Sequence, residues 1–144
     1  MRMTVLHLGL AVAFLMGAAA ARGDAPQSAP ADATPVSAET GSDGVQRLSI
    51  TLDSYSYTPS HIVVEAGKPV EFELKNVAST APHDFKIDAG ALGPEIKQDV
   101  KAGKTATLRF TPTVPGTYQF YCDKKLPFLP SHKDKGMVGT LDVH

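Results

Sequence analysis

Three segments of this chain alternate apolar and polar residues with a period of two, and this pattern constrains the fold most strongly. They are residues 48–52, 70–75 and 105–110. In each segment the apolar side chains share one face of an extended chain, as in a β-strand with one buried face. Turns that contain glycine or proline separate these runs, and no convincing amphipathic helix is found. The chain is therefore predicted to be all-β, with its strands packed as a single-domain sandwich or barrel. Residues 88–98 are expected to be a connecting loop with room for one helical turn.

The first 44 residues have a different composition. Arg2 precedes a mostly apolar run over residues 5–16, and four alanines follow at 18–21. This order predicts a secretory signal peptide over residues 1–23, with an uncleaved membrane anchor as the alternative. Residues 24–44 are rich in Ala, Pro, Ser, Thr and Asp, so they are expected to form a disordered linker. The folded domain is expected over residues 45–144, in a protein exported to the bacterial periplasm without stable membrane insertion after cleavage.

Charge and cysteine content narrow the possible functions. The chain carries 14 Lys and Arg against 15 Asp and Glu, and it lacks a basic stripe with interleaved aromatic residues. Nucleic-acid binding is therefore not predicted. The chain has one cysteine, whereas structural cysteines of exported proteins come in pairs. A single cysteine in such a protein suggests that its thiol binds a metal.

Three other residues make Cys122 a candidate metal ligand. Cys122 closes a β-patterned run over residues 117–122, and His83, His132 and Met137 could join it. Along their predicted strands, His83, Cys122 and Met137 fall on the faces that also carry apolar side chains. His132 lies in a predicted loop, where parity cannot place it. One thiolate, two imidazoles and one thioether are the ligand set of a blue-copper electron-transfer site.

Other chemistries fit these residues less well. A cysteine nucleophile needs an open approach and an oxyanion site, usually at a helix N-terminus, but this cysteine ends a predicted strand. Zinc could bind one Cys and two His, yet a thioether is a poor fourth ligand for zinc. A two-copper centre needs a second cysteine, which the chain lacks.

The order His83, Cys122, His132, Met137 resembles the cupredoxins, the family of plastocyanin and azurin, over residues 45–144. The resemblance implies a Greek-key β-sandwich that holds one copper ion, cycling between Cu(I) and Cu(II), through these four residues. It further implies a monomeric electron carrier, not an enzyme, that meets redox partner proteins transiently. In the family the histidine of the C-terminal loop is exposed, and electrons leave through its edge. Here that residue is His132.

The chain departs from the family pattern in two places. Asp84 follows His83 where an asparagine usually ties the two ligand loops together, and we expect it to contact the cysteine sulfur. Nine residues separate Cys122 from His132, instead of the usual two to four. We expect residues 123–131 to form a flap beside His132, with Phe128 and Leu129 providing an apolar surface for docking. Four nearby lysines (Lys124, Lys125, Lys133 and Lys135) could attract an acidic partner.

Two further function classes stay open. A periplasmic cupredoxin can serve copper tolerance or homeostasis by binding or sequestering copper, and the long loop could make the site more open. The chain lacks a Met-rich or His-rich tail that would collect further copper ions. A cupredoxin-like module can also be purely structural, but the complete ligand set argues against that reading.

Overall fold

The computed structural model describes residues 33–88, 90 and 92–144, and the predicted signal peptide and the linker up to residue 32 lie outside this range. The described residues form eleven strands and no helix. The strands are β1 (Val36–Ser37), β2 (Glu39–Thr40), β3 (Gln46–Asp53), β4 (Ser56–Thr58), β5 (His61–Val64), β6 (Val70–Asn76), β7 (His83–Ile87), β8 (Ile96–Val100), β9 (Thr105–Phe110), β10 (Gly116–Tyr121) and β11 (Val138–Val143). Within this part of the chain, nothing helical is long and apolar enough to cross a membrane.

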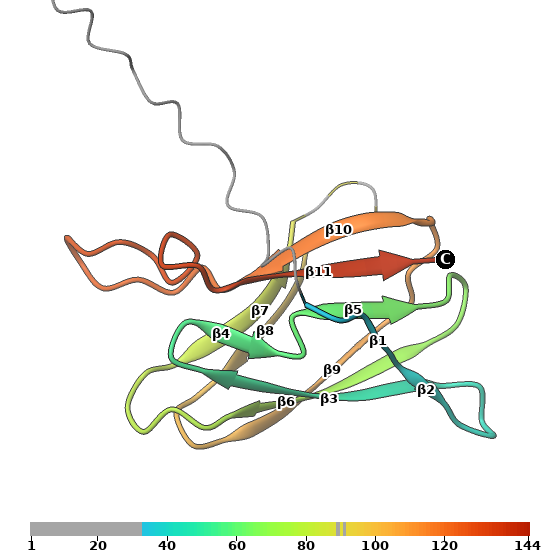
Figure 1. The fold of residues 1–144 in the computed structure, drawn as a ribbon, viewed down its shortest axis with the longest axis horizontal. Coiled ribbons are helices and arrows are strands. Elements are labelled where there is room, and N and C mark those ends of the chain that lie inside the picture. The colour runs from blue at the N-terminus through green and yellow to red at the C-terminus, as the bar shows by residue number, and fades with distance from the viewer. Residues whose placement is uncertain (1–32, 89, 91) are drawn as a thin grey trace, which may run out of the picture.

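Two mixed sheets pack as a sandwich (Figure 1). The first sheet has six strands in the order β1-β5-β11-β10-β7-β8, and the second has the order β2-β3-β6-β9 with β4 added beside β3. Strands β3 and β6 run parallel, as do β5 and β11, whereas β10 is antiparallel to both of its neighbours. The prediction of a single all-β sandwich from the period-two segments is confirmed.

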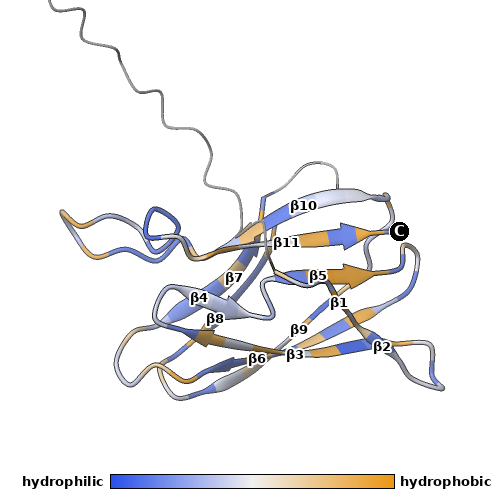
Figure 2. Ribbon diagram, viewed as in Figure 1, coloured by the Kyte–Doolittle hydropathy of each residue, from blue (hydrophilic) through white to orange (hydrophobic). Residues whose placement is uncertain are grey.

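The strands bury their apolar faces as the alternation predicts (Figure 2). Three buried phenylalanines join the two sheets. Phe85 of β7 and Phe120 of β10 stack with their ring centroids 4.5 Å apart, and Phe72 of β6 meets Phe85 edge-on at 5.8 Å. Gly139 lies opposite Phe120, where a Cβ atom would come within 2.7 Å of the Ser60 carbonyl oxygen and closer still to the Phe120 ring. Such dense packing restricts movement of β7 and β10, the strands that carry Phe85 and Phe120.

The structure differs from the sequence prediction at two segments. Strands β1 and β2 lie in the segment expected to be a linker, and they pair with β5 and β3 at the sheet edges. The side chains of both strands are exposed, and the strands are attached to the sheets by main-chain hydrogen bonds. Amino-acid composition does not predict such main-chain pairing. Residues 96–98, the last part of the expected loop over 88–98, belong instead to β8, whose main chain pairs with β7 along five residues. The Gly90–Gly93 bridge stands where we expected a helical turn.

Candidate metal centre

The pairing of three neighbouring strands brings the predicted ligands to one end of the first sheet. Strand β10 is antiparallel to both neighbours, and its last residue, Tyr121, pairs with Val138 at the start of β11 and with Lys86 of β7, so the chain that continues past Tyr121 runs toward the start of β7. His83 begins β7, Cys122 follows the last residue of β10, and Met137 precedes the first residue of β11. His132 comes from the loop between β10 and β11. The short ligand-bearing segments are thus fixed by a sheet whose core is tightly packed.

Three of the predicted residues point their ligand atoms at one another. The Nδ1 atoms of His83 and His132 are 3.1 Å apart. The Sγ atom of Cys122 lies 3.4 Å from the His132 Nδ1 and 3.9 Å from the His83 Nδ1. Among the described residues, this is the group of His, Cys, Asp and Glu side chains that could hold a metal ion, and all three members are buried.

The triangle formed by these atoms has the size that a metal ion requires. A point equidistant from the three atoms would lie about 2 Å from each of them. Metal–nitrogen bonds to histidine are about 2.0–2.1 Å and metal–sulfur bonds to cysteine about 2.3 Å, as known for zinc. The donor set and its spacing therefore fit a small cation bound by two imidazoles and one thiolate.

Burial sets the protonation state of the three side chains. Burial, more than any neighbour, lowers the pKa of His83, and the His132 ring adds to the effect. The pKa of His132 is lowered first by burial and then by the charges of Lys135 and Lys124. Burial also raises the pKa of the Cys122 thiol to about 12. At neutral pH the metal-free site consequently holds neutral imidazoles and a protonated thiol, whose proton a bound cation would displace.

Met137 is tied to both loop residues of the site through its main chain. Its carbonyl oxygen accepts a hydrogen bond from the Cys122 N–H at 3.1 Å, and its own N–H donates to the His132 carbonyl at 2.9 Å. The loop closes further where the Lys133 N–H donates to the Cys122 carbonyl at 2.9 Å. The Met137 side chain is fully buried in the same apolar cluster as Cys122. The sequence expectation that Met137 shares the interior with Cys122 therefore agrees with the structure.

Asp84 contacts the sulfur of Cys122 through its main chain. The Asp84 N–H points to the Cys122 Sγ at 3.4 Å. The carboxylate oxygen Oδ1 accepts a hydrogen bond from the Asp123 N–H at 2.9 Å, which ties the two ligand-bearing segments together. Asp84 is fully buried, although strand parity places it on the polar face.

The second oxygen of the Asp84 carboxylate has no hydrogen-bond partner. The amino groups of Lys97 and Lys124 lie 3.5 and 3.6 Å from it, at ion-pair distance but beyond good hydrogen-bond distance. Burial is the largest influence on the Asp84 carboxyl group, and it raises the pKa of this group. The pKa of the partly exposed Asp123 carboxylate is lowered, first by the neighbouring Asp84 carboxyl group and then by Lys97, with which it pairs at 2.7 Å. A polar network on this side of the site thus surrounds one buried carboxyl group.

His132 is less exposed than the family resemblance implies. Only 9% of its surface is accessible. The ring of Tyr55 lies edge-on against the imidazole with a centroid separation of 5.0 Å, and the Tyr55 hydroxyl accepts a hydrogen bond from Lys135 at 3.0 Å. Sequence analysis missed Tyr55, because it belongs to the turn after β3, where the alternation ends. Its positive φ of 61° is the only unusual local feature.

The flap, residues 123–131, projects beyond the sandwich at the end remote from the C-terminus (Figure 1). Its tip is a turn in which the Leu129 N–H donates to the Leu126 carbonyl at 3.1 Å. Pro127 and Phe128 are the central residues, and Phe128 has a φ of 64°, as in a type II turn where glycine is preferred. Phe128 is fully exposed, and Leu126 and Leu129 are more than half exposed. The expected apolar surface on the flap is therefore present.

The comparisons with known proteins agree with this geometry. Residues 8–138 match the family model of the cupredoxin-like domain. A plastocyanin from Prochlorothrix hollandica is 32% identical over 120 residues, which cover 81% of this chain and 78% of the relative. The fold resembles that of an auracyanin from Roseiflexus castenholzii, with a TM-score of 0.57 and 21% identity, covering 74% of this chain and 98% of that one. It also resembles the metal-binding domain of a Cu(I)-exporting P-type ATPase from Streptococcus pneumoniae, with a TM-score of 0.60 and 20% identity, covering 78% and 97%.

Proposed function

The chain belongs to the cupredoxin-like family, and we propose that it is an exported type 1 copper protein that carries single electrons. One observation carries the proposal: two histidine Nδ1 atoms and one cysteine Sγ surround a point about 2 Å from each, inside a buried site. This donor set is the one used by blue-copper electron-transfer sites.

We assign the ligands to His83, Cys122, His132 and Met137, with one copper ion per chain. Copper supplies a one-electron couple between Cu(I) and Cu(II) at this site. His83, Cys122 and His132 would hold the ion with two imidazoles and one thiolate, and the thioether of Met137 would be a weaker fourth donor. The support for Met137 is its full burial beside Cys122 and its main-chain bonds to both loop ligands.

The residues around the site would keep its shape constant when its charge changes. The Asp84 N–H that points at the Cys122 sulfur would stabilise a thiolate and orient it. The Asp84 carboxylate holds the main chain of Asp123, and the stacked Phe85 and Phe120 hold the two ligand strands. The rigid scaffold is what fast electron exchange requires.

The location and the partner are parts of this proposal. A signal peptide over residues 1–23 and an unpaired cysteine favour export to the bacterial periplasm. A monomer that meets redox proteins briefly fits the exposed apolar tip of the flap and the lysines near it, because small apolar contacts with charged surroundings suit transient encounters.

Copper tolerance is the second candidate, and one observation favours it. Tyr55 and the loop residues leave His132 only 9% exposed, so they could serve to retain copper rather than to pass electrons. Stopped-flow exchange with an acidic c-type cytochrome separates the two functions. A carrier should be reduced and reoxidised completely in repeated cycles without losing copper. A storage protein should exchange electrons slowly, while it holds copper against strong chelators.

A further inference from the structure

A hollow of about 310 Å³ lies between the flap and the body of the protein. Leu126, Leu129 and Pro130 line its flap side, and Tyr55 and Pro82 line the opposite side. His132 forms part of its wall. The volume is at the lower end of the range of about 300–1,000 Å³ that holds small ligands in proteins. One or two aromatic rings would fill it.

The charges around this hollow have one sign. Lys124, Lys125 and Lys135 line it, and no acidic residue does. The amino group of Lys124 pairs with Asp99 at 2.6 Å. Within the described part of the chain, Lys125 and Lys135 have no carboxylate within ion-pair distance, and the Lys135 amino group donates to the Tyr55 hydroxyl. Asp134 is the carboxylate nearest in effect, since its pKa is lowered first by local hydrogen bonds and further by the charge of Lys125, but it does not line the hollow. Two cations thus lie beside an apolar hollow without forming an ion pair.

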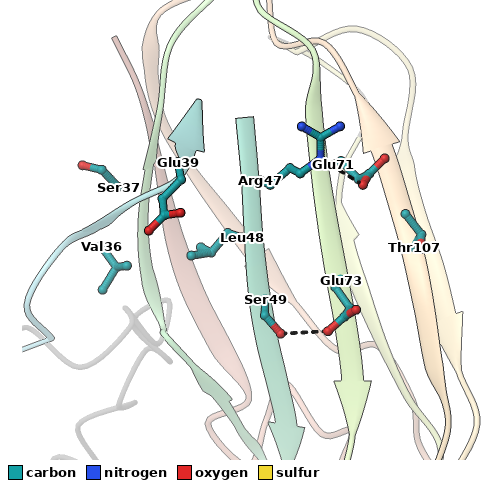
Figure 3. A pocket seen from close by; sticks show the side chains of 9 residues that line it. All are labelled: Val36, Ser37, Glu39, Arg47, Leu48, Ser49, Glu71, Glu73 and Thr107. Carbon is teal, nitrogen blue, oxygen red and sulfur yellow. Dashed lines mark hydrogen bonds and ion pairs between the residues drawn. The ribbon is translucent and has the colours of Figure 1, made fainter. Parts of the chain in front are cut away.

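A larger hollow on the second sheet shows the contrasting arrangement (Figure 3). Its volume is about 490 Å³, and its charged lining residues are the glutamates Glu39, Glu71 and Glu73 and one arginine, Arg47. Arg47 reaches Glu71 at 3.4 Å, and the Ser49 hydroxyl donates to Glu73 at 3.2 Å. Negative charge is therefore in excess there, so this lining would repel an anion. The hollow beside His132 differs in its more apolar lining and in the positive sign of its charge.

We propose that the hollow beside His132 binds a small organic anion with a flat apolar body, of the aromatic carboxylate class. The apolar body would lie between Leu129 and the Tyr55 ring, and the carboxylate would meet Lys125 and Lys135. Because His132 is a wall residue, the bound molecule would touch its imidazole. The role of that contact in electron exchange rests on the proposed function, whereas the binding itself does not.

The shape of the flap favours a small molecule over the flat face of a protein. Phe128 is fully exposed at the tip and does not line the hollow. A flat partner surface that rests on Phe128 would cover the flap without filling the hollow, because His132 lies recessed with 9% exposure. A small molecule can enter the hollow and reach the ring. The proposed occupant is therefore free in solution and not a side chain of a docked protein.

The test is an NMR titration of the full ¹⁵N-labelled chain with 2-naphthoate, in the metal-free and in the diamagnetic Cu(I)-loaded protein. We expect saturable shift changes centred on Tyr55, Leu129 and His132. The neutral analogue 2-naphthamide should bind about fivefold more weakly, and so should naphthoate to the variant with Lys125→Gln and Lys135→Gln. Leu129→Ser should also weaken binding by about fivefold.

Two matched variants at the other end of the sandwich serve as controls. Lys68→Gln removes an exposed lysine and Val114→Ser an exposed valine, and neither should change the affinity. Equal affinity for naphthoate and naphthamide, or an affinity unaffected by the lysine variants, would overturn the proposal. It would equally be overturned if an acidic peptide shifted the same signals while naphthoate did not, because the hollow would then accept a partner's side chain. The titration of the metal-free protein tests the binding of naphthoate even if copper does not bind at Cys122, so the two proposals can fail independently.

Discussion

The Nδ1 atoms of His83 and His132 face each other at 3.1 Å, although the residues lie 49 positions apart in the chain. His83 begins a strand, and His132 belongs to the long loop after β10. Two ring nitrogens and a sulfur converge in a buried space, and with neutral imidazoles and a thiol at most two of their three contacts can be hydrogen bonds, because each bond needs one donor and one acceptor. A cation at their centre would accept electron pairs from all three atoms, and the predictions below follow from that arrangement.

Cys122→Ser and Met137→Leu should have different effects on the copper-loaded protein. The thiolate would be the source of an intense charge-transfer band in the visible spectrum, so Cys122→Ser should abolish the band. Met137→Leu removes only a weak axial donor, so the band should persist while the reduction potential rises. Absorption spectroscopy and voltammetry check both outcomes. A band that survives in Cys122→Ser would exclude the cysteine as a ligand, whereas a green colour in the native protein would not.

Metal binding should release one proton per site at pH 8. The pKa of the Cys122 thiol is about 12, and the pKa values of both histidines are lowered, so only the thiol carries a displaceable proton at this pH. The apparent affinity should therefore rise about tenfold per pH unit from pH 7.5 to 9. Anaerobic calorimetry with Cu(I) in two buffers of different protonation enthalpy counts the protons. Release of none would mean that the thiol is not a ligand.

Asp84→Asn should stabilise the metal-free protein at neutral pH. Burial raises the pKa of Asp84, so its contribution to folding is most favourable below the unfolded pKa of about 3.9 and is lost as pH rises through the folded pKa. Asparagine keeps an acceptor for the Asp123 N–H without a charge that can be lost or gained. Urea denaturation between pH 4 and 8 should show a higher midpoint for the variant at pH 8 and a smaller difference at pH 4.

Glu65→Gln is the matched control for Asp84→Asn, because Glu65 is exposed and lies at the other end of the sandwich. Its denaturation profile should follow that of the native protein. If Asp84→Asn were less stable than the native protein at pH 8, the ion pairs with Lys97 and Lys124 would outweigh the cost of burial.

The exposed residues of the flap should govern docking more than copper binding. Phe128→Ser with Leu129→Ser removes two exposed apolar side chains, and we expect electron exchange with an acidic carrier protein to slow about tenfold. Copper affinity and colour should stay nearly unchanged. The opposite pattern, with lower copper affinity and an unchanged rate per copper site, would make the flap a lid and favour copper handling.

Phe128 should contribute nothing to the stability of the fold. Its side chain is fully exposed, and its φ of 64° is costly for a bulky residue. Phe128→Gly removes the backbone strain of the folded state, but glycine also has more conformational freedom in the unfolded chain. Because these two effects oppose each other, the free energy of unfolding should change by less than about 1 kcal/mol. Phe120→Ala, in the core, should cost about 3–5 kcal/mol. Urea denaturation of the two variants checks the contrast.

Much of the fold could be predicted from the sequence, because alternation reports directly which face of a strand is buried. The buried positions of His83, Cys122 and Met137 follow from that parity. Asp84 is an exception to this parity, because Lys97, Lys124 and Asp123 surround its carboxyl group and allow it to be buried. These residues come from distant segments, and a local sequence pattern does not encode such contacts. The same holds for Tyr55, which reaches His132 from a turn 77 positions earlier in the numbering.

The central claim is that one copper ion is bound by His83, Cys122, His132 and Met137. The most direct measurement is a crystal structure of the copper-loaded protein with an anomalous difference map at the copper absorption edge. We predict a single peak per chain that lies about 2 Å from the Nδ1 atoms of His83 and His132, close to the Cys122 sulfur, with the Met137 sulfur on its axis. A peak elsewhere, or a copper ion without the Cys122 sulfur among its ligands, would contradict the account.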